Sequence, residues 1–224
     1  NYGSTFNNIF WNTFLNNQYG IDNTNSINDE NKILKNNFIN NINQVNVFGQ
    51  NNFSHPTMGG NYWSNLNGND LNLDGYIDNP YVINFNNVDN YPLVHPYLLT
   101  SEERFAYLGN KFKLKISDPS HPNTYYAILV SLGNQPVIVL PDGRIIYLTF
   151  DGLLIYSLSY PNSGIFYNNL GTLDQDGIGK ATIDIPNDPL LNGINLYFAS
   201  IILNNNAPLG IESISQTVKV KISD

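Results

Sequence analysis

The stretch NNIFWNTFLNNQYGI (residues 7–21) is followed by NKILKNNFINNINQV (residues 31–45), and the two segments align at a shift of 24 positions. The aligned residues are Ile9 with Ile33, Phe10 with Leu34, Asn12 with Asn36, Phe14 with Phe38, Leu15 with Ile39, Asn16 with Asn40, Asn17 with Asn41 and Ile21 with Val45. A period of this length is typical of solenoid proteins, in which each repeat stacks on the next. The repeat predicts coils of a parallel β-helix with the apolar side chains inside.

The asparagines of the repeat have two expected roles. Asn tolerates the left-handed backbone conformation at corners, and stacked Asn side chains can form ladders of amide hydrogen bonds. The alternative is an Asn-rich low-complexity tract, which would not keep its large apolar residues in register. Because about three repeats are normally needed to bury a continuous core, we expect further coils, or another copy of the chain, to stack on the N-terminal edge. An uncovered edge would leave strand groups unpaired.

Composition divides the chain in two. Asparagine supplies 28 of the first 100 residues but only 12 of the remaining 124, which indicates a boundary near Thr100–Glu103 and domains at 1–100 and 101–224. The net charge is −8, and neither half has the basic patch that nucleic acid or an anionic membrane requires. No apolar run approaches the ~20 residues of a membrane span. The chain has no cysteine, so it forms neither a disulfide nor a thiolate metal site.

The segment GNDLNLDGYIDNPYVI (residues 68–83) matches most of a calcium-loop pattern, with oxygen-bearing side chains at alternate positions followed by Gly75. The expected calcium ligands are Asp70, Asn72, Asp74, Asp78 and the carbonyl of Tyr76. The twelfth position is Tyr81 instead of the usual Glu, so the loop is not a complete EF-hand. Hard oxygen donors without His or Cys favour calcium. The alternative is an Asn/Asp-rich turn whose side chains bond its own backbone.

The first half of the chain resembles a known family. The segments GGNYWSNLNGNDLNLDGYIDNPYVI (residues 59–83) and NVDNYPLVHPYL (residues 87–98) look like the C-terminal end of NosD-like right-handed parallel β-helix proteins, and the resemblance covers residues 5–99. It implies a β-helix whose final coil is closed by the Asp-rich loop, in a secreted or periplasmic protein. The family belongs to a wider group of carbohydrate-binding and sugar-hydrolysing β-helices.

The second half reads as a set of β-strands separated by turns. The expected strands are KFKLKIS, TYYAILVSLG, PVIVL, GRIIYLTF, GLLIYSLSY, GKATIDIP, INLYFASIIL and TVKVKIS. About eight strands of this kind favour an antiparallel β-sandwich. Lysines alternate with apolar residues in 111–116 and 218–222, so these two segments are expected to be neighbouring edge strands with lysines outward.

Residues 108–223 also resemble a C-terminal β-sandwich module of secreted bacterial surface proteins. The most specific part of this likeness is GTLDQDGIGKATIDIPNDPLLNGINLYF (residues 171–198). The module implies no catalytic residues. Within it, Asp174-Gln175-Asp176-Gly177 is a tight turn or a second calcium turn.

The repeats offer little for acid–base catalysis. The charged residues of positions 7–50 are Asp22, Asp29, Glu30, Lys32 and Lys35. They cluster in what reads as a loop, whereas polysaccharide-cleaving β-helices gather carboxylates across adjacent coils. We therefore expect a protein that is not an enzyme.

Two functions fit these features. The first is an extracellular or cell-surface structural protein that assembles through its open β-helix end, for example into a filament. The second is a carbohydrate-binding or polysaccharide-processing β-helix protein in which the rings of Tyr62, Trp63 and Tyr81 stack on an extracellular glycan. These rings are equally suited to cap the last coil. A secreted or surface location agrees with the candidate N-glycosylation sequon at Asn52-Phe53-Ser54.

Overall fold

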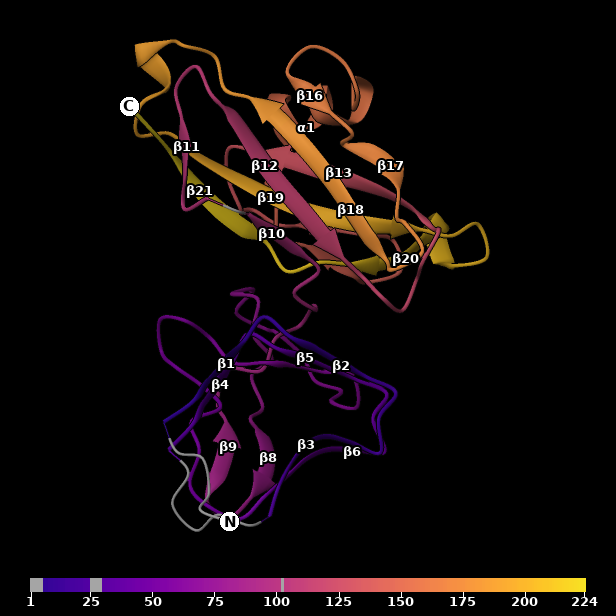
Figure 1. Ribbon diagram of the computed structural model, residues 1–224. Coiled ribbons are helices and arrows are strands. Elements are labelled where there is room, and N and C mark those ends of the chain that lie inside the picture. Colours follow the sequence, from indigo (N-terminus) through magenta and orange to yellow (C-terminus); the bar gives the residue numbers. More distant parts are fainter. Residues whose placement is uncertain (1–5, 25–29, 102) are drawn as a thin grey trace. The chain divides into compact units, whose positions relative to one another are not determined.

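The computed structural model describes residues 6–24, 30–101 and 103–224, and these residues form an all-β protein (Figure 1). The chain divides into two compact units, residues 1–97 (unit 1) and 98–224 (unit 2). The division falls between Tyr97 and Leu98, slightly before the boundary that composition indicates. The helices of the described chain lack the length and apolarity needed to cross a bilayer.

Unit 1 is built from short strands that recur with the sequence repeat. The first repeat contains β1 (Asn8–Phe10), β2 (Thr13–Leu15) and β3 (Tyr19–Asn23), and the second contains β4 (Lys32–Leu34), β5 (Asn37–Ile39) and β6 (Asn43–Val47). The later strands are β7 (Tyr62–Trp63), β8 (Tyr81–Asn84) and β9 (Asn87–Asp89). Figure 1 shows β1, β2 and β3 lying beside β4, β5 and β6 respectively.

The pairing of these strands confirms the register read from the repeat. All three pairs are parallel and join residues 24 apart, for example Ile9 with Ile33, Phe14 with Phe38 and Ile21 with Val45. β5 also pairs in parallel with β7, whereas β8 and β9 form an antiparallel hairpin. Three of the aligned apolar pairs pack in the core of unit 1, namely Ile9 with Ile33, Phe14 with Phe38 and Ile21 with Val45.

An aromatic column runs through this core. Phe14 stacks on Phe38 with ring centroids 5.0 Å apart, Phe38 on Trp63 at 4.4 Å, and Trp63 on Tyr81 at 4.1 Å, with interplanar angles of 15°, 7° and 12°. Stacked aromatic pairs contribute about 0.5–1.5 kcal/mol beyond the area they bury. The column therefore packs one ring from each repeat, Phe14 and Phe38, against Trp63 of β7 and Tyr81 of β8.

The corners of the repeats differ from the expectation. The left-handed residues are Phe6, Trp11 and Asn16 in the first repeat and Glu30, Lys35 and Asn40 in the second. Asn takes this conformation at only two of the six corners. The next residue is an Asn in every case. In each case the side chain of that following Asn hydrogen-bonds to the neighbouring repeat or to a later ladder position.

Unit 2 contains two larger sheets. Its strands are β10 (Leu99–Ser101), β11 (Phe105–Tyr107), β12 (Lys111–Ser117), β13 (Tyr125–Ser131), β14 (Ile138–Val139), β15 (Ile145–Ile146), β16 (Phe166–Tyr167), β17 (Leu170–Thr172), β18 (Ile178–Asp184), β19 (Asn195–Leu203), β20 (Ile211–Ile214) and β21 (Val218–Ser223). One sheet has the order β10-β12-β18-β16, and the other has the order β11-β21-β19-β13-β17 with β20 beside β19. β14 and β15 form a separate pair.

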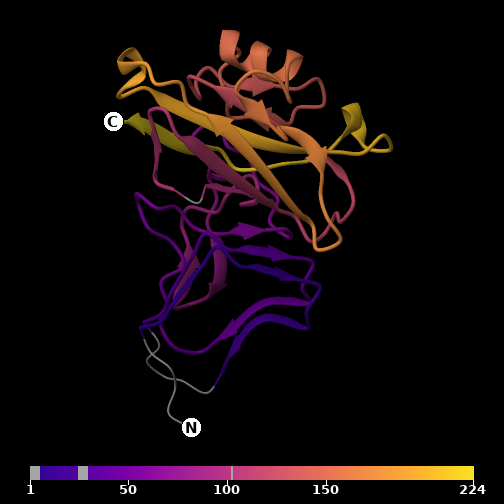
Figure 2. The same ribbon diagram turned by 45° about the horizontal axis from the view of Figure 1, so that its top comes forward.

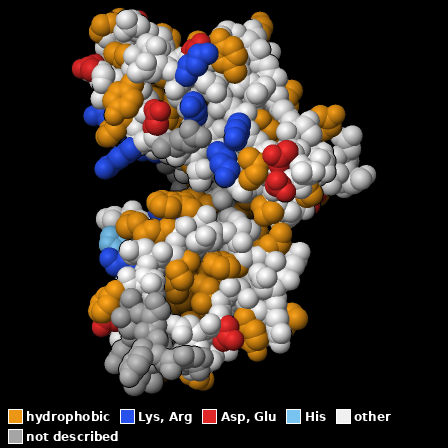
Figure 3. All heavy atoms as spheres, in the orientation of Figure 1, with side chains coloured by type: hydrophobic (Ala, Val, Ile, Leu, Met, Phe, Trp, Pro, Cys, Tyr) orange, Lys and Arg blue, Asp and Glu red, His pale blue; other side chains and the backbone are white. Residues whose placement is uncertain are grey.

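The inner faces of the two sheets share one apolar cluster. Phe112 from one sheet and Phe198 from the other are fully buried, and their rings stack at 5.7 Å. The lysines of β12 and β21 point outward as expected, with a burial pattern that alternates along each strand. Figure 3 shows Lys and Arg side chains in a row on unit 2.

The predicted pairing of these two lysine-bearing strands is wrong. β12 lies between β10 and β18, whereas β21 lies between β11 and β19 in the other sheet. The expectation missed β10 and β11, which cover the outer edges, because both are only three residues long. Lysine on these strands marks a solvated face and not a sheet edge.

The segment GLLIYSLSY, expected to be a strand, is the helix α1 (Gly152–Ser159). Asp151 caps it, because its Oδ1 accepts a hydrogen bond from the N–H of Leu154 at 2.9 Å. Its Oδ2 accepts one from the N–H of Leu132, just after β13, at 2.7 Å. Leu154 packs with Leu129 of β13 in a second apolar cluster, and Figure 2 shows α1 over the face of the sheets. A short apolar run does not distinguish helix from strand, and Asp151 was the overlooked helix signal.

Candidate functional site

Asparagine side chains join the repeats in continuous ladders. Asn12 donates from its backbone N–H and its Nδ2 to Oδ1 of Asn36, at 3.0 and 3.1 Å. Asn36 donates in the same way to Oδ1 of Asn61, at 3.0 and 3.1 Å. Parallel ladders run from Asn7 through Asn31 and Asn51, and from Asn17 to Asn41. The amide ladders that the Asn spacing predicts are therefore confirmed, and every rung points its donors in the same direction along the stack.

The middle ladder ends at Asp89, which is fully buried. Its Oδ2 accepts hydrogen bonds from the N–H of Asn61 at 2.7 Å and from Nε1 of Trp63 at 2.9 Å, and its Oδ1 accepts from the N–H of Tyr91 at 3.0 Å. A carboxylate is an acceptor only, so it ends the ladder without adding a donor. Gly60 lies against this carboxylate, and a Cβ at that position would collide with it.

Burial sets the protonation behaviour of Asp89. Removal of the carboxylate from water raises its pKa from the ordinary 3.8 to about 6, although the hydrogen bonds from Asn61, Trp63 and Tyr91 lower it. The desolvation effect is larger than the combined effect of the donors. Asp89 is thus a buried group that titrates close to neutral pH at one end of the stack.

The other end of the stack is open among the described residues. β1, β2 and β3 each pair on one side only. Nothing in the described chain donates to Oδ1 of Asn12 or of Asn17, although each donates its own amide onward to the next repeat. Among the described residues, the outer groups of β1, β2 and β3 and the Oδ1 atoms of Asn12 and Asn17 therefore have no partner on this side.

The Asp/Asn-rich loop lies between β7 and β8 and is held by its own side chains. Asp70 accepts hydrogen bonds from the N–H of Asp74 at 3.1 Å and of Gly75 at 2.8 Å. Asn72 Oδ1 accepts from the N–H of Asp74 at 3.0 Å, Asp74 Oδ1 from that of Tyr76 at 2.9 Å, and Asp78 Oδ2 from that of Leu71 at 2.9 Å. Gly75 has φ 93°, as a tight turn of this kind requires.

The five expected calcium ligands thus share one loop, but their carboxylates are not gathered. The described chain contains no group of three or more His, Cys, Asp or Glu side chains placed to hold a metal ion. Both oxygens of Asp70 already accept backbone N–H groups. This arrangement is that of a side-chain-stabilised turn.

The three candidate aromatic residues lie in and beside the column. Trp63 is 1% exposed and is enclosed between Phe38 and Tyr81, so it offers no ring face to a glycan. Tyr81 is the last ring of the column and covers the outer face of Trp63. The hydroxyl of Tyr81 accepts a hydrogen bond from Nδ2 of Asn65 at 3.1 Å. Burial raises the pKa of Tyr62. These contacts suit a cap better than a sugar platform.

The remaining sequence candidates lie apart from one another. Asn52 is exposed, and its Oδ1 accepts the N–H of Ser54 at 3.2 Å. The turn at Asp174 is closed by a hydrogen bond from the N–H of Gly177 to its carbonyl at 3.0 Å, and it joins strands of different sheets. Of the charged residues in the repeats, Asp29 lies outside the described residues.

Two features of the structure are not predicted by the sequence pattern. Asp89 was not recognised as a ladder end, because it follows Asn61 by 28 positions and so breaks the 24-residue period. The sequence signal for this ladder end is Asp89 itself, an acid in the segment NVDNY (residues 87–91) where an Asn would continue the ladder. The second feature is a hollow around Tyr125 in unit 2, which is lined by residues of four separate parts of the chain: 121–125, 162, 170–172 and 203–206.

A search with models of known protein families finds no match to the chain. No curated protein matches it significantly. The likeness to NosD-like proteins therefore rests on the sequence segments alone.

Proposed function

We propose that this chain is a non-enzymatic structural protein of the cell surface or extracellular space, and that unit 1 is the terminal part of a right-handed parallel β-helix of the NosD-like type. Unit 2 is then a β-sandwich module that follows it in the chain. The observation that supports this function most directly is the chemical difference between the two ends of the Asn ladders. One end stops at the acceptor Asp89, and the other leaves the amide oxygens of Asn12 and Asn17 without donors among the described residues.

The chemical difference between the two ladder ends indicates what kind of chain can pair with the open edge. A layer that fits must supply parallel strands together with backbone and side-chain N–H groups spaced as in the repeats. A further coil of the same type does so, because every rung donates toward the Asp89 end. The capped end of a second copy does not fit, since its ladder ends in a carboxylate and Tyr81 covers its aromatic column. Extension by coils is therefore favoured over head-to-tail stacking of copies.

The extension is tested by adding one coil. In the extended protein a copy of residues 7–30 replaces residues 1–6, so that the copy runs directly into Asn7. We expect the melting temperature of unit 1 to rise by at least ~5 °C, because the added strands and amides pair with the open edge; about 1 kcal/mol shifts a domain of this size by ~4–8 °C. Both tryptophans lie in unit 1, so tryptophan fluorescence follows this unit alone.

The matched control has Ala in place of the Asn residues of the added coil that correspond to Asn7, Asn12 and Asn17. It keeps the apolar side chains and the backbone N–H groups but lacks the side-chain amide donors, and it should lose part of the gain. A melting temperature that is unchanged by either coil, or raised equally by both, would contradict the proposal.

We further propose that the loop of residues 68–83 takes a weakly bound structural calcium ion. The support is the ligand pattern of the sequence and the lone pairs that each carboxylate retains beside its hydrogen bonds. The ligands are Asp70, Asn72, Asp74, Asp78 and the carbonyl of Tyr76. Since the carboxylates are not gathered, they must move together to bind. We therefore expect a dissociation constant of about 10⁻⁴–10⁻³ M, as in extracellular calcium modules.

The calcium proposal predicts that 5 mM calcium raises the melting temperature of unit 1 relative to excess chelator, by about 5 °C or more for a site saturated to this degree. The Asp74→Asn variant keeps the turn acceptor but loses a charge, and it should lose most of the response. Asp174→Asn, in the turn of unit 2, should retain it. A melting temperature that is the same in calcium and in chelator would contradict the calcium proposal and leave the loop as a turn stabilised by its own side chains.

A further inference from the structure

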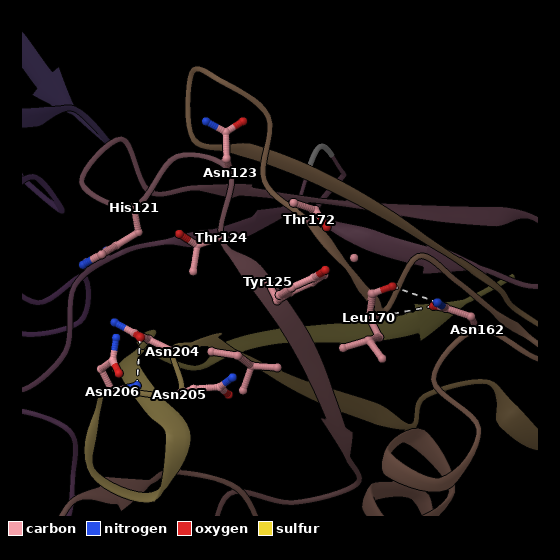
Figure 4. Close-up of a pocket in the computed structure, with 12 residues that line it drawn as sticks. His121, Asn123, Thr124, Tyr125, Asn162, Leu170, Thr172, Asn204, Asn205 and Asn206 are labelled. Atoms are coloured by element: carbon pink, nitrogen blue, oxygen red, sulfur yellow. Dashed lines mark hydrogen bonds between the residues drawn. The ribbon is translucent and has the colours of Figure 1, made fainter.

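A broad hollow of about 920 Å³ lies on unit 2 around Tyr125. Figure 4 shows Tyr125 between the Asn204–Asn206 turn on one side and Leu170 with Asn162 on the other. The hollow lies within unit 2, and its walls come from segments near residues 123, 170 and 205. Its size falls in the usual range for small-molecule sites.

The floor of the hollow is a row of neighbouring residues on the six-stranded sheet. Tyr125 of β13 is paired with Thr172 of β17 on one side and with Leu203 of β19 on the other. Strand alternation buries Tyr126 in the core between the sheets and turns Tyr125 to the opposite face. The apolar cluster under α1 covers Leu129 further along that face but not Tyr125, whose side chain is 64% exposed.

Two asparagines fix the walls of the hollow. Asn162 donates from Nδ2 to the carbonyl of Leu170 at 2.7 Å and accepts the N–H of Leu170 at 3.1 Å. Asn204 donates from Nδ2 to Glu212 at 2.7 Å and accepts the N–H of Asn206 at 3.0 Å. Each of these side-chain amides donates one hydrogen bond and accepts another, and these bonds hold the loops that form the walls.

Other polar groups of the hollow remain available. No hydrogen bond within the described protein is made by the side-chain amides of Asn123, Asn205 and Asn206 or by the hydroxyls of Tyr125 and Thr172. Each amide both donates and accepts, as does each hydroxyl. The hollow therefore combines the ring face of Tyr125 with the apolar side chains of Leu170 and Leu203. Side-chain amides that make no other hydrogen bond surround it.

We propose that this hollow is a binding site for a neutral oligosaccharide. A sugar ring has one face of C–H groups, which complements the electron-rich face of Tyr125. Its edge of hydroxyls both donates and accepts hydrogen bonds, as do the Asn and Thr side chains around it. This binding function is separate from the structural role proposed for unit 1.

The charge of the lining selects a neutral ligand. No Lys, Arg, Asp or Glu is among the residues that line the hollow, so an acidic polysaccharide or a phosphate finds no cation there. His121 also lines the hollow, and Figure 4 shows its side chain directed away from Tyr125. It is held by Asp118, whose Oδ2 lies 2.8 Å from its Nδ1.

The test is affinity electrophoresis of the full chain in gels that contain a soluble neutral polysaccharide: laminarin, xylan, mannan or dextran. Polygalacturonate serves as the acidic comparison. We expect retardation by at least one neutral polysaccharide, followed by titration with its oligosaccharides. Tyr125→Ala should weaken binding at least 10-fold, whereas Tyr125→Phe should stay within about 3-fold, because stacking contributes more than the hydroxyl.

The matched control is Tyr107→Ala, which removes a partly exposed ring elsewhere on unit 2 and should leave binding unchanged. Calorimetry of each variant shows that unit 2 still unfolds as in the native chain. The proposal is overturned if no neutral polysaccharide retards the protein, if only polygalacturonate does, or if Tyr125→Ala binds as tightly as the native chain. None of these outcomes bears on the added-coil experiment, so the two proposals fail separately.

Discussion

Replacement of Trp63 by Ala is expected to destabilise unit 1 by about 3–5 kcal/mol, the usual cost of removing a large buried aromatic side chain. Trp63 is almost fully buried between Phe38 and Tyr81, and its Nε1 donates to Asp89. The variant therefore leaves a cavity in the aromatic column and removes a donor from a buried carboxylate. Calorimetry of the full chain should show the unit 1 transition lowered by more than about 12 °C.

Trp11→Ala is the matched control, because Trp11 is the other tryptophan of the chain and is 58% exposed. Its ring contacts the edge of Phe10 and lies 5.8 Å from Nζ of Lys35. The cost of this change should stay below about 1 kcal/mol. Equal destabilisation by the two changes would show that the column does not hold unit 1 together.

Replacement of Asp89 by Ala is the second large effect. It leaves three donors without this acceptor: the buried N–H of Asn61, the buried Nε1 of Trp63 and the partly buried N–H of Tyr91. An unsatisfied buried donor costs about 1–3 kcal/mol, so the free energy of unfolding should fall by at least about 2 kcal/mol. Urea unfolding followed by tryptophan fluorescence measures this for unit 1.

The Asp89→Asn variant tests the protonation of the same group. The folded pKa of Asp89, about 6, lies above its ordinary value of 3.8, so the folded state holds this proton to higher pH than the unfolded chain. The stability that Asp89 contributes is therefore greatest below about pH 4, declines as the pH rises to about 6 and is constant above that. The decline amounts to about 3 kcal/mol for a shift of about two units.

Asn does not titrate, and either orientation of its amide points an NH₂ group at a neighbouring N–H donor. The variant should be less stable than the native chain at both pH 4.5 and pH 7, and the difference should be larger at pH 4.5 by about 2 kcal/mol. A difference that is the same at both pH values would mean that Asp89 does not titrate in this range. Asp78→Asn, in the exposed loop, is the control for a general loss of one carboxylate.

The strand register of the repeats could be predicted from the sequence because the same interactions recur at a fixed spacing. Each strand of the first repeat pairs with a strand at the same place in the second, so one shift of 24 residues specifies every contact from Ile9 to Ile21. Beyond Val47 the period fails, since the ladder positions are Asn51, Asn61, Asn87 and Asp89 and the intervening loops differ in length. The sequence contains these residues but no regular spacing that connects them.

The calcium loop and α1 show the same limit at shorter range. The loop motif identified residues that lie together, but whether their oxygens face an ion or their own backbone depends on the path of the loop. In α1 the apolar run fits a helix or a strand, and the choice was made by the Asp151 cap and by the packing of Leu154 on β13.

The sequence by itself determined the all-β class, the 24-residue register and the outward direction of the lysines, because alternation and repetition are properties of neighbouring residues. The tertiary structure decided the sheet to which β12 and β21 belong, the acceptor that closes the ladder and the hollow around Tyr125. Each of these depends on residues far apart in the chain, such as Asn123, Leu170 and Asn205. Long-range pairing follows from the packing of the whole unit, and no local pattern encodes which distant segments will meet.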